Sequence, residues 1–344
     1  MYMIIKNLTF VVLASLMLAY ASCSPAAQEE KQSQTDTTIT VSAPSAGLAA
    51  VLKVLDMKGA PANNGAYPAF VEAKALYKML SKKPVILDVR SADAYKAGHI
   101  KGAISVLPAD IPEYWAKNTE ALAKADTLVI VDADGQTAAY VTALLRLNSV
   151  SNAFSLKFGM AAWNKSVAAE SWEKAVSSDF ESKLDTSEAT KPQFSGWPLQ
   201  SDSVAEVEAY FSERWKALFA EPMPFVDAND VFSNSQQYFI MNYDRKDRYQ
   251  SGHIPGAVRY KPENLLGNID EMSTLPAGKP IVVYCNTGQN ASYVTAYLRL
   301  AGYDAKILNH GCNSFMHSKM MAEKTDLAWI PFTQEQVNNF PLSK

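Results

Sequence analysis

The chain has 344 residues, of which 48% are apolar and 19% are charged, and its formal net charge is −3 at pH 7. These fractions are ordinary for globular protein, and the length favours two domains. A small negative charge gives no basic surface, so we expect no nucleic-acid partner.

The first 23 residues have the features of a secretory signal peptide. Lys6 supplies a positive charge, residues 8–18 are apolar, and Ala21 and Ser22 precede Cys23. The apolar stretch is too short for an ordinary membrane span.

The end of this segment is similar to a bacterial lipobox, with Tyr20 as a loose match. The similarity implies lipidation of Cys23 at a new N-terminus, and plain secretion is the alternative. We therefore expect an exported lipoprotein of the bacterial cell envelope, anchored in a membrane on its periplasmic or outer face. Residues 24–45 are polar and are expected to be a flexible tether.

Two pairs of segments reveal an internal repeat. PVILDVRSADAYKAGHIKGAISV (84–106) matches YFIMNYDRKDRYQSGHIPGAVRY (238–260). TLVIVDADGQTAAYVTALLRL (127–147) matches PIVVYCNTGQNASYVTAYLRL (280–300). Phe70-Val71-Glu72-Ala73 also pairs with Phe225-Val226-Asp227-Ala228. The offset stays at 153 to 155 residues throughout, so one domain occurs twice.

Each copy alternates short apolar strands with helical segments, which predicts an α/β fold with a parallel sheet covered by helices. The second copy is expected to have strands near 238–242, 257–260, 281–285 and 305–308 and helices near 227–233, 245–250, 290–301 and 313–322. We expect an N-terminal domain over 46–172, a linker over 173–202 and a C-terminal domain over 203–344. An amphipathic helix over 203–219 is expected to pack between the two domains.

The second copy has a cysteine where an apolar strand ends. Cys285 opens the polar loop CNTGQN, which leads into a helical segment. Such a loop points backbone N–H groups inward at the positive end of a helix. There the pKa of a cysteine can fall from about 8.5 to about 3.5–7.5, so the thiol is expected to ionise easily. The alternative is a small buried apolar residue, as most lone cysteines are.

These motifs resemble those of the rhodanese (sulfurtransferase) family. The resemblance rests on Asp88-Val89-Arg90, both Gly-His-Ile-x-Gly-Ala segments and the loop that Cys285 opens, and it covers roughly residues 65–335. It implies two tandem rhodanese-like domains, each a central parallel sheet of five strands flanked by helices. Tandem members usually combine a silent N-terminal domain with a catalytic C-terminal one. Here Asp132 stands where the second copy has Cys285, and a carboxylate cannot form a persulfide.

The resemblance implies a sulfurtransferase that needs no cofactor. Cys285 would take sulfur from thiosulfate or a mercapto acid such as 3-mercaptopyruvate as a persulfide, and would pass it to cyanide or a thiol. Arg248 precedes an aromatic residue, where active tandem members carry an arginine, and is expected to bind the anionic group of the donor. The backbone N–H groups of the loop are expected to hold the persulfide anion, from Asn286, Thr287, Gly288, Gln289, Asn290 and Ala291.

Within this loop, Gly288 is expected to be needed for the backbone turn. The side chains of Thr287 and Gln289 either touch the substrate or are ordinary polar groups of a loop.

One departure from the family pattern concerns the catalytic copy. Asp88-x-Arg90 of the first copy becomes Asn242-x-Asp244 in the second. Either Arg245 compensates for the lost pair, or the activity is low.

A second departure is Cys312, interpreted as a replacement for a glycine in the turn after the strand at 305–308. Loops at the carboxyl ends of parallel strands gather at one edge, so Cys312 is expected near the Cys285 loop. It would either resolve the persulfide, or form a redox disulfide with Cys285, or be a chance small residue.

His99 and His253 hold matching positions in the two copies, which indicates a structural hydrogen bond. The four histidines have no metal-binding spacing, so no metal is expected. Two other functions stay open, namely a non-catalytic binding or scaffold lipoprotein and a thiol oxidoreductase of the cell envelope. A phosphatase is disfavoured because Asn290 and Ala291 stand where its loop needs an arginine.

Overall fold

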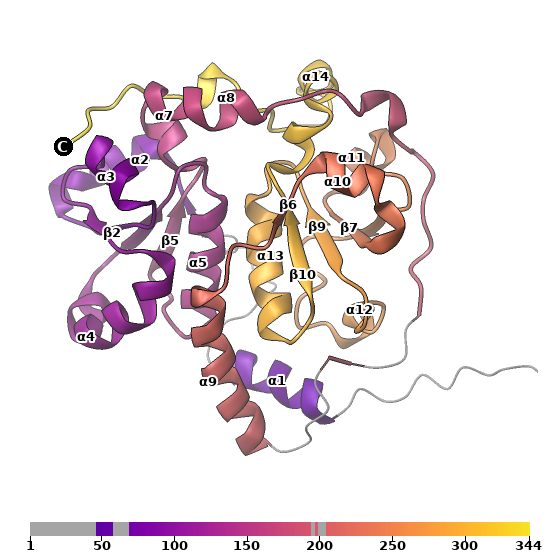
Figure 1. The fold of residues 1–344 in the computed structure, drawn as a ribbon, viewed down its shortest axis with the longest axis horizontal. Coiled ribbons are helices and arrows are strands. Elements are labelled where there is room, and N and C mark those ends of the chain that lie inside the picture. Colours follow the sequence, from indigo (N-terminus) through magenta and orange to yellow (C-terminus); the bar gives the residue numbers. More distant parts are fainter. Residues whose placement is uncertain (1–45, 58–68, 194–196, 199–203) are drawn as a thin grey trace, which may run out of the picture. The chain divides into compact units, whose positions relative to one another are not determined.

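The computed structural model describes residues 46–57, 69–193, 197–198 and 204–344. The predicted signal peptide, Cys23 and the tether at 24–45 lie outside these residues. The described residues belong to a single unit, Val41–Lys344, which contains two five-stranded parallel sheets (Figure 1).

The first repeat spans residues 69–175, and its strands have the order β1-β5-β4-β2-β3 in the sheet. Its elements are β1 Phe70–Val71, α2 Ala73–Met79, η1 Leu80–Lys82, β2 Val85–Asp88, α3 Ala92–Ala97, β3 Ile104–Ser105, η2 Pro108–Asp110, α4 Ile111–Lys124, β4 Leu128–Val131, α5 Gln136–Leu147, β5 Ala153–Leu156, α6 Gly159–Trp163, α7 Lys165–Glu170 and α8 Trp172–Ala175.

The second repeat spans residues 225–322, and its sheet has the equivalent order β6-β10-β9-β7-β8. Its elements are β6 Phe225–Val226, α10 Ala228–Ser233, η4 Ser235–Gln237, β7 Phe239–Tyr243, α11 Lys246–Ser251, β8 Val258–Tyr260, α12 Ile269–Met272, β9 Ile281–Tyr284, α13 Gln289–Leu300, β10 Ala305–Leu308, η5 Gly311–Ser314 and α14 His317–Ala322. The predicted fold class is therefore confirmed, and the predicted strands agree with the observed ones to within one residue.

The registers of the two sheets are also equivalent. Leu87 of β2 lies opposite Ile130 of β4, and Met241 of β7 lies opposite Val283 of β9. The central strands are buried on both faces, as parallel strands covered by helices are. The loops that follow β4 and β9 therefore leave equivalent edges of their sheets.

Helices α5 and α13 pack against each other between the two sheets (Figure 1). The inner faces of both sheets and these two helices share one continuous apolar core, while each outer face has a core of its own. The two repeats are therefore joined through the helices that begin directly after the two loops.

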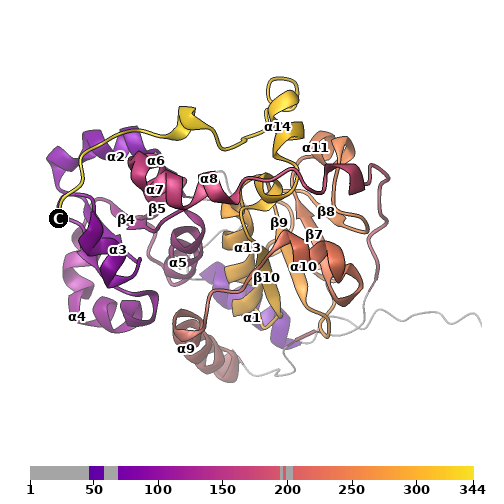
Figure 2. The ribbon, with the colours of Figure 1, turned by 45° about the horizontal axis from the view of Figure 1, so that its top comes forward.

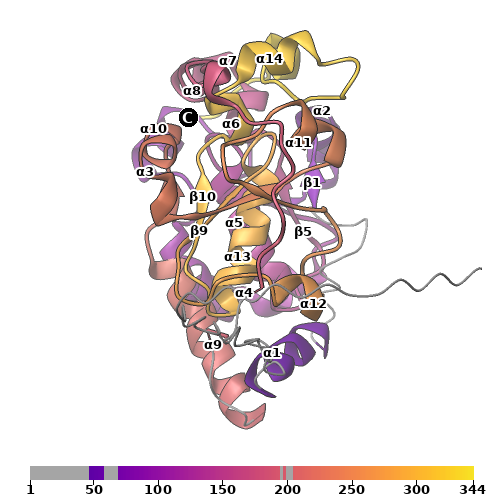
Figure 3. The same ribbon diagram turned by 90° about the vertical axis from the view of Figure 1, so that its right-hand side faces the viewer.

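Helix α9, Val204–Ala220, packs against α13 and against α1, Ala46–Met57 (Figure 3). Trp215 of α9 donates a hydrogen bond from Nε1 to the Leu144 carbonyl of α5 at 2.7 Å. Arg214 donates from Nε to the Arg299 carbonyl of α13 at 3.3 Å. The predicted helix therefore contacts both repeats, as expected. The boundaries of the two domains and the linker stay predictions.

The C-terminal segment, residues 323–344, returns from the second repeat to the first and includes η6, Gln334–Gln336. Trp163 donates from Nε1 to the Pro341 carbonyl at 3.1 Å. The backbone groups of His99 and Ser343 exchange two hydrogen bonds at 2.9 and 2.8 Å, so the chain ends beside α3 (Figure 2). This segment was assigned to the C-terminal domain, yet its last residues pack on the first repeat.

Helix η3, Glu181–Lys183, lies in the connection between the repeats. Every helix within the described ranges is too short or too polar to span a bilayer. In the same ranges no three His, Cys, Asp or Glu side chains are arranged to hold a metal ion.

Candidate active site

The loop after β9 turns directly into α13, and Gly288 makes the turn. Gly288 has φ +73 and lies at the N-terminal cap of α13. A Cβ atom there would lie 2.1 Å from Oε1 of Gln136 in the first repeat. The left-handed backbone therefore favours glycine, and a larger side chain would also displace the Gln136 side chain.

The sulfur of Cys285 faces the backbone amides of this loop. The N–H of Ala291 donates to Sγ at 3.4 Å, and the backbone N–H groups of Thr287 and Asn290 also lower the pKa of the thiol. The residue is only 3% exposed, however, and burial raises the pKa of Cys285 to about 11. The expectation of an easily ionised thiol is thus wrong for this structure, because loss of hydration outweighs the amide groups.

A segment far along the chain closes over the loop. This closing segment, residues 327–332, is joined to it at Ile330, whose N–H donates to Oδ1 of Asn286 at 3.1 Å. Asn313, which is fully buried, donates from Nδ2 to the Asn286 carbonyl at 2.8 Å and accepts from the Phe332 N–H at 2.7 Å. The side chains of Asn286 and Asn313 therefore hold the closing segment against the loop that Cys285 opens, through hydrogen bonds.

Arg248 lies at the site, but its guanidinium is already engaged. Nη1 pairs with Asp244 at 2.9 Å, Nε donates to the Leu327 carbonyl at 2.9 Å, and Nη2 donates to the Ala328 carbonyl. The guanidinium carbon also lies 5.4 Å from the ring centroid of Trp329. In this structure the expected donor-binding arginine therefore holds the closing segment in place.

The altered Asp–Arg pair is a transposition. In the first repeat, Arg90 binds Asp88 through two hydrogen bonds of 2.9 and 2.6 Å. In the second repeat, Asp244 occupies the position of the arginine, and its partner is Arg248, four residues later. The expectation that Arg245 compensates is wrong, because its exposed side chain pairs with Asp247.

Asp244 connects Arg248 to the loop, since its Oδ2 accepts a hydrogen bond from Nδ2 of Asn286. Burial raises the pKa of Asp244, and the charge of Arg248 opposes that shift. Asp244 in turn raises the pKa of Cys285. One buried carboxylate therefore links the arginine, the loop and the thiol.

Cys312 contacts the loop through its backbone, with its N–H donating to the Cys285 carbonyl at 2.9 Å. Met160 makes the equivalent bond to Asp132 at 2.8 Å, so Cys312 corresponds to Met160. The statement that Cys312 replaces a glycine is therefore wrong, since the glycine of this turn is Gly311, with φ +55.

The two cysteines are both free and buried, and burial raises the pKa of Cys312 well above its ordinary value. Their side chains belong to different apolar clusters, Cys285 to the shared inner core and Cys312 to the outer core of the second repeat. A resolving role for Cys312 stays a prediction.

Gln289 contacts the other repeat, although the sequence left a substrate contact open. It is 1% exposed, and its Oε1 accepts from the backbone N–H of Phe158 at 2.8 Å. The equivalent Gln136 accepts from the backbone N–H of His310 at 2.8 Å. Each glutamine thus caps a turn of the opposite repeat, which explains why Gly-Gln occurs in both copies.

The two matched histidines have the structural role that the sequence predicted. His99 Nδ1 lies 3.0 Å from the Tyr95 carbonyl, and His253 Nδ1 lies 2.7 Å from the Tyr249 carbonyl. Each imidazole also stacks on the ring of that tyrosine.

The corresponding loop of the first repeat carries a carboxyl group in place of the thiol. Oδ1 of Asp132 accepts from the Gly135 N–H at 2.6 Å, and burial together with Asp134 raises the pKa of Asp132 well above its usual range. Burial raises the pKa of Asp134 too, but His310, 3.2 Å away, leaves it below its usual value. This loop keeps the geometry of its counterpart without a nucleophile.

A family model described as the Rhodanese-like domain matches residues 72–166 and 228–318, together more than half of the chain. The chain belongs to the rhodanese-like family. It is a tandem member, with one match in each repeat, and the two matched ranges include the loops after β4 and β9. A search of the curated proteins finds no match.

A search of the solved structures gives several matches of low identity. A rhodanese-like domain protein from Staphylococcus aureus is 28% identical, with 28% of this chain and 90% of that one covered and a TM-score of 0.24. A rhodanese-related protein from Thermoplasma volcanium is 22% identical, over 27% and 87%, with a TM-score of 0.24. A thiosulfate sulfurtransferase from Pseudomonas aeruginosa is 15% identical, over 78% of this chain and 47% of that one, with a TM-score of 0.30.

Two features of this site were missed at the level of sequence. The spacing of Asp244 and Arg248 in the sequence could have predicted their pairing, because residues four apart lie on one side of a helical turn. The closing segment gave no signal, since its polar contacts to Asn286 and Asn313 are made by backbone groups, which every sequence carries.

Proposed function

We propose that this rhodanese-like protein is a sulfurtransferase in which Cys285 carries sulfur as a persulfide. The observation that best supports this is the set of backbone N–H groups aimed at Sγ, from Ala291, Thr287 and Asn290. Fixed N–H groups stabilise an anion at the position where it forms, as they do in an oxyanion hole. They suit both a thiolate and a persulfide anion.

The first step is attack of the Cys285 thiolate on the outer sulfur of the donor. With thiosulfate, the bond between its two sulfur atoms breaks. The electron pair of that bond leaves with sulfite, so that Cys285–S–S⁻ remains. With a mercapto acid such as 3-mercaptopyruvate, the C–S bond breaks and its electron pair goes to the carbon. That carbon takes the proton of the donor's own thiol, which gives pyruvate and leaves Cys285–S–S⁻. In the second step cyanide or a thiol attacks the outer sulfur, and the Cys285 thiolate is released.

Arg248 is proposed to bind the anionic group of the donor by exchanging partners. The donor's oxygens would replace the carbonyls of Leu327 and Ala328, which the guanidinium now binds. A guanidinium fork suits carboxylate or sulfonate oxygens, because it can donate two parallel hydrogen bonds to an anion, whereas the two carbonyls carry no charge. Binding of the donor would thus release the closing segment and hydrate the thiol, which lowers its pKa.

The backbone of Ala328 favours this exchange. Its φ is +49, a left-handed conformation that costs a non-glycine residue about 1–2 kcal/mol. Release of the closing segment would relieve this strain.

A non-catalytic binding or scaffold role is the second candidate. A thiol that is 3% exposed, with a pKa of about 11, is a poor nucleophile as long as the site stays closed. The thiol oxidoreductase has weaker support. The Cys312 N–H binds the Cys285 carbonyl at 2.9 Å, but both thiols are free and their side chains lie in different apolar clusters.

Donor turnover separates these candidates. The assay compares release of sulfite from thiosulfate and of pyruvate from 3-mercaptopyruvate, with cyanide as the acceptor. We expect turnover with one donor or both, and loss to background in Cys285→Ser. Cys312→Ser is the matched control and should retain turnover. Absence of turnover with every donor would favour the scaffold, and a loss in Cys312→Ser equal to that in Cys285→Ser would favour the oxidoreductase.

We also propose that the protein is exported and anchored to a membrane through lipid on Cys23. The support is the sequence pattern of residues 1–23. Expression with a radiolabelled fatty acid in a bacterial host tests it: label should enter the wild type and be lost in Cys23→Ser. Equal labelling of both proteins, or none in either, would contradict the anchor.

A further inference from the structure

The first repeat has a cavity at the place where the second repeat has its closed site. The cavity has a volume of about 420 Å³ and lies over Ala133, the second residue of the loop after β4. Its other walls come from α3, α7 and the end of the C-terminal segment, with Arg90, Ala94, Val167, Glu170 and Leu342 among its lining residues.

One substitution between the repeats contributes to the open space. Ala94 of α3 holds the position that Arg248 holds in the second repeat. There the arginine side chain occupies the site together with the Trp329 ring. In the first repeat a methyl group replaces the arginine, which leaves room for a small molecule.

Arg90 brings an unused hydrogen-bond donor to this cavity. The residue is 9% exposed, and its Nε and Nη2 bind Asp88 and the Gly98 carbonyl. Its Nη1 donates no hydrogen bond to any residue that the structure describes. Nη1 is therefore left to water or to a ligand, and a carboxylate oxygen is a charged acceptor that suits it.

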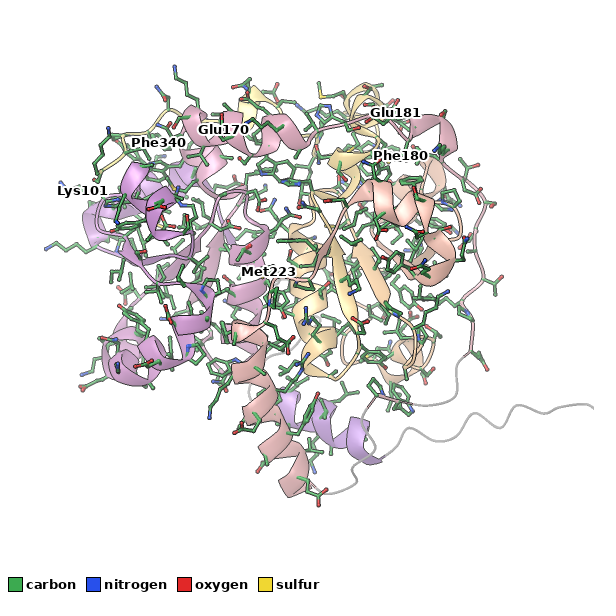
Figure 4. All side chains as sticks on the ribbon, in the orientation of Figure 1. Lys101, Glu170, Phe180, Glu181, Met223 and Phe340 are labelled. Atoms are coloured by element: carbon green, nitrogen blue, oxygen red, sulfur yellow. The ribbon has the colours of Figure 1, made fainter. Side chains whose placement is uncertain are left out.

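The rest of the wall is mainly apolar. Ala94, Ala97, Val167 and Leu342 contribute aliphatic groups. The Glu170 carboxylate is largely exposed and pairs with Lys174 on the surface, so it opposes an anion in the cavity only weakly (Figure 4 shows Glu170 on α7).

The C-terminal segment contributes one wall of the cavity through Leu342. Leu342 packs on Gly98, where a Cβ atom would lie only 2.7 Å from Cδ1 of the leucine. The paired backbone bonds between His99 and Ser343 hold this contact. Figure 4 shows the segment at Phe340, beside the first repeat.

We propose that this cavity binds a short-chain monocarboxylate, with its carboxylate on Nη1 of Arg90 and its aliphatic chain against Ala94, Val167 and Leu342. Asp88 already neutralises Arg90, so one further negative charge is accommodated more readily than the two charges of thiosulfate. The cavity is separate from the Cys285 loop, and the proposal does not depend on sulfur transfer.

Methyl NMR of the full-length protein tests this directly, with butyrate as the probe. At about 10 mM, a ligand with a Kd near 1 mM fills about nine-tenths of its sites. We expect the methyl signals of Leu342 and Val167 to shift, while Leu107, which lines a different cavity, stays unchanged. Absence of a shift at Leu342 and Val167 would overturn the proposal, and so would an equal shift with neutral butyramide.

A variant whose side chain fills the cavity gives a second test of the proposal. Ala94→Leu should weaken butyrate binding at least about tenfold, the effect of 1.4 kcal/mol. Ala92→Leu is the matched control, because Ala92 is exposed on the same helix and does not line the cavity. Unchanged signals of Leu107 in both variants show that the fold is kept. Equal affinity in the two variants would contradict the assigned site.

Discussion

The two repeats share one architecture and differ where chemistry would occur. Their sheets have equivalent strand orders, and their loops both begin a helix after a glycine with positive φ. Yet the loop residue is Asp132 in one and Cys285 in the other, and the buried ion pair is built from different positions. The shared features maintain the fold and the joint between the repeats. The differing ones decide which half carries a nucleophile and which carries an open cavity.

The largest expected effect on stability comes from breaking the buried Asp–Arg pair of each repeat. Asp88→Ala and Asp244→Ala each leave a buried guanidinium without its carboxylate, which typically costs about 3–5 kcal/mol. We expect similar losses in urea-induced unfolding followed by tryptophan fluorescence. A loss below about 1 kcal/mol in Asp244→Ala alone would show that the second repeat does not rely on its pair.

The hydrogen bonds that Gln136 and Gln289 accept from the opposite repeat should have the next largest effect on stability. Gln136→Ala leaves the N–H of His310 without an acceptor, and Gln289→Ala does the same to Phe158. An unsatisfied buried donor costs about 1–3 kcal/mol. The same unfolding measurement should give a larger loss for Gln136→Ala, because Nε2 of Gln136 also donates to Asp134 at 3.1 Å and to Asn309 at 2.9 Å, while Nε2 of Gln289 has no partner among the described residues. A loss in Gln289→Ala that equals or exceeds the loss in Gln136→Ala would contradict this.

The Cys285 thiol should make the stability of the folded protein depend on pH. The folded pKa of about 11 lies above the ordinary value of about 8.5. Folding therefore favours the protonated thiol. This contribution to stability is complete below pH 8.5 and is lost as the pH rises from there through 11.

The rate of alkylation with iodoacetamide also reports the pKa of the Cys285 thiol. The rate at Cys285 should rise about tenfold per pH unit between pH 8 and 10, without a plateau, because the thiolate is the reacting form. Asp244→Asn should shift the profile to lower pH, since the Asp244 carboxylate raises this pKa. A plateau below pH 9 in the wild type would refute the closed, desolvated thiol.

The smallest effects should come from exposed ion pairs. Lys124→Ala removes a pair with Glu120 on α4, and Lys174→Ala removes one with Glu170. Pairs of this spacing typically contribute about 0.3–0.5 kcal/mol. These variants serve as controls for the buried pairs, and a loss above about 1 kcal/mol in either would point to a contact beyond the exposed pair.

The sequence predicted the duplicated α/β fold, the loop that Cys285 opens and the place of Arg248, because those depend on local pattern and on the repeat. It did not predict how Gln289 is used, since a polar loop residue serves a substrate or a neighbouring repeat equally well. It also missed the burial of Cys285. The side chain packs in the apolar core that the two repeats share, so its burial depends on residues far apart in the sequence.

The most direct test of the account is mass spectrometry of the protein after incubation with thiosulfate or 3-mercaptopyruvate, without an acceptor. Sulfur transfer through a persulfide predicts one additional sulfur atom on the peptide that contains Cys285. The mass should return to its original value when cyanide is added, and the peptide that contains Cys312 should keep its mass. An unmodified Cys285 peptide with both donors would contradict the account.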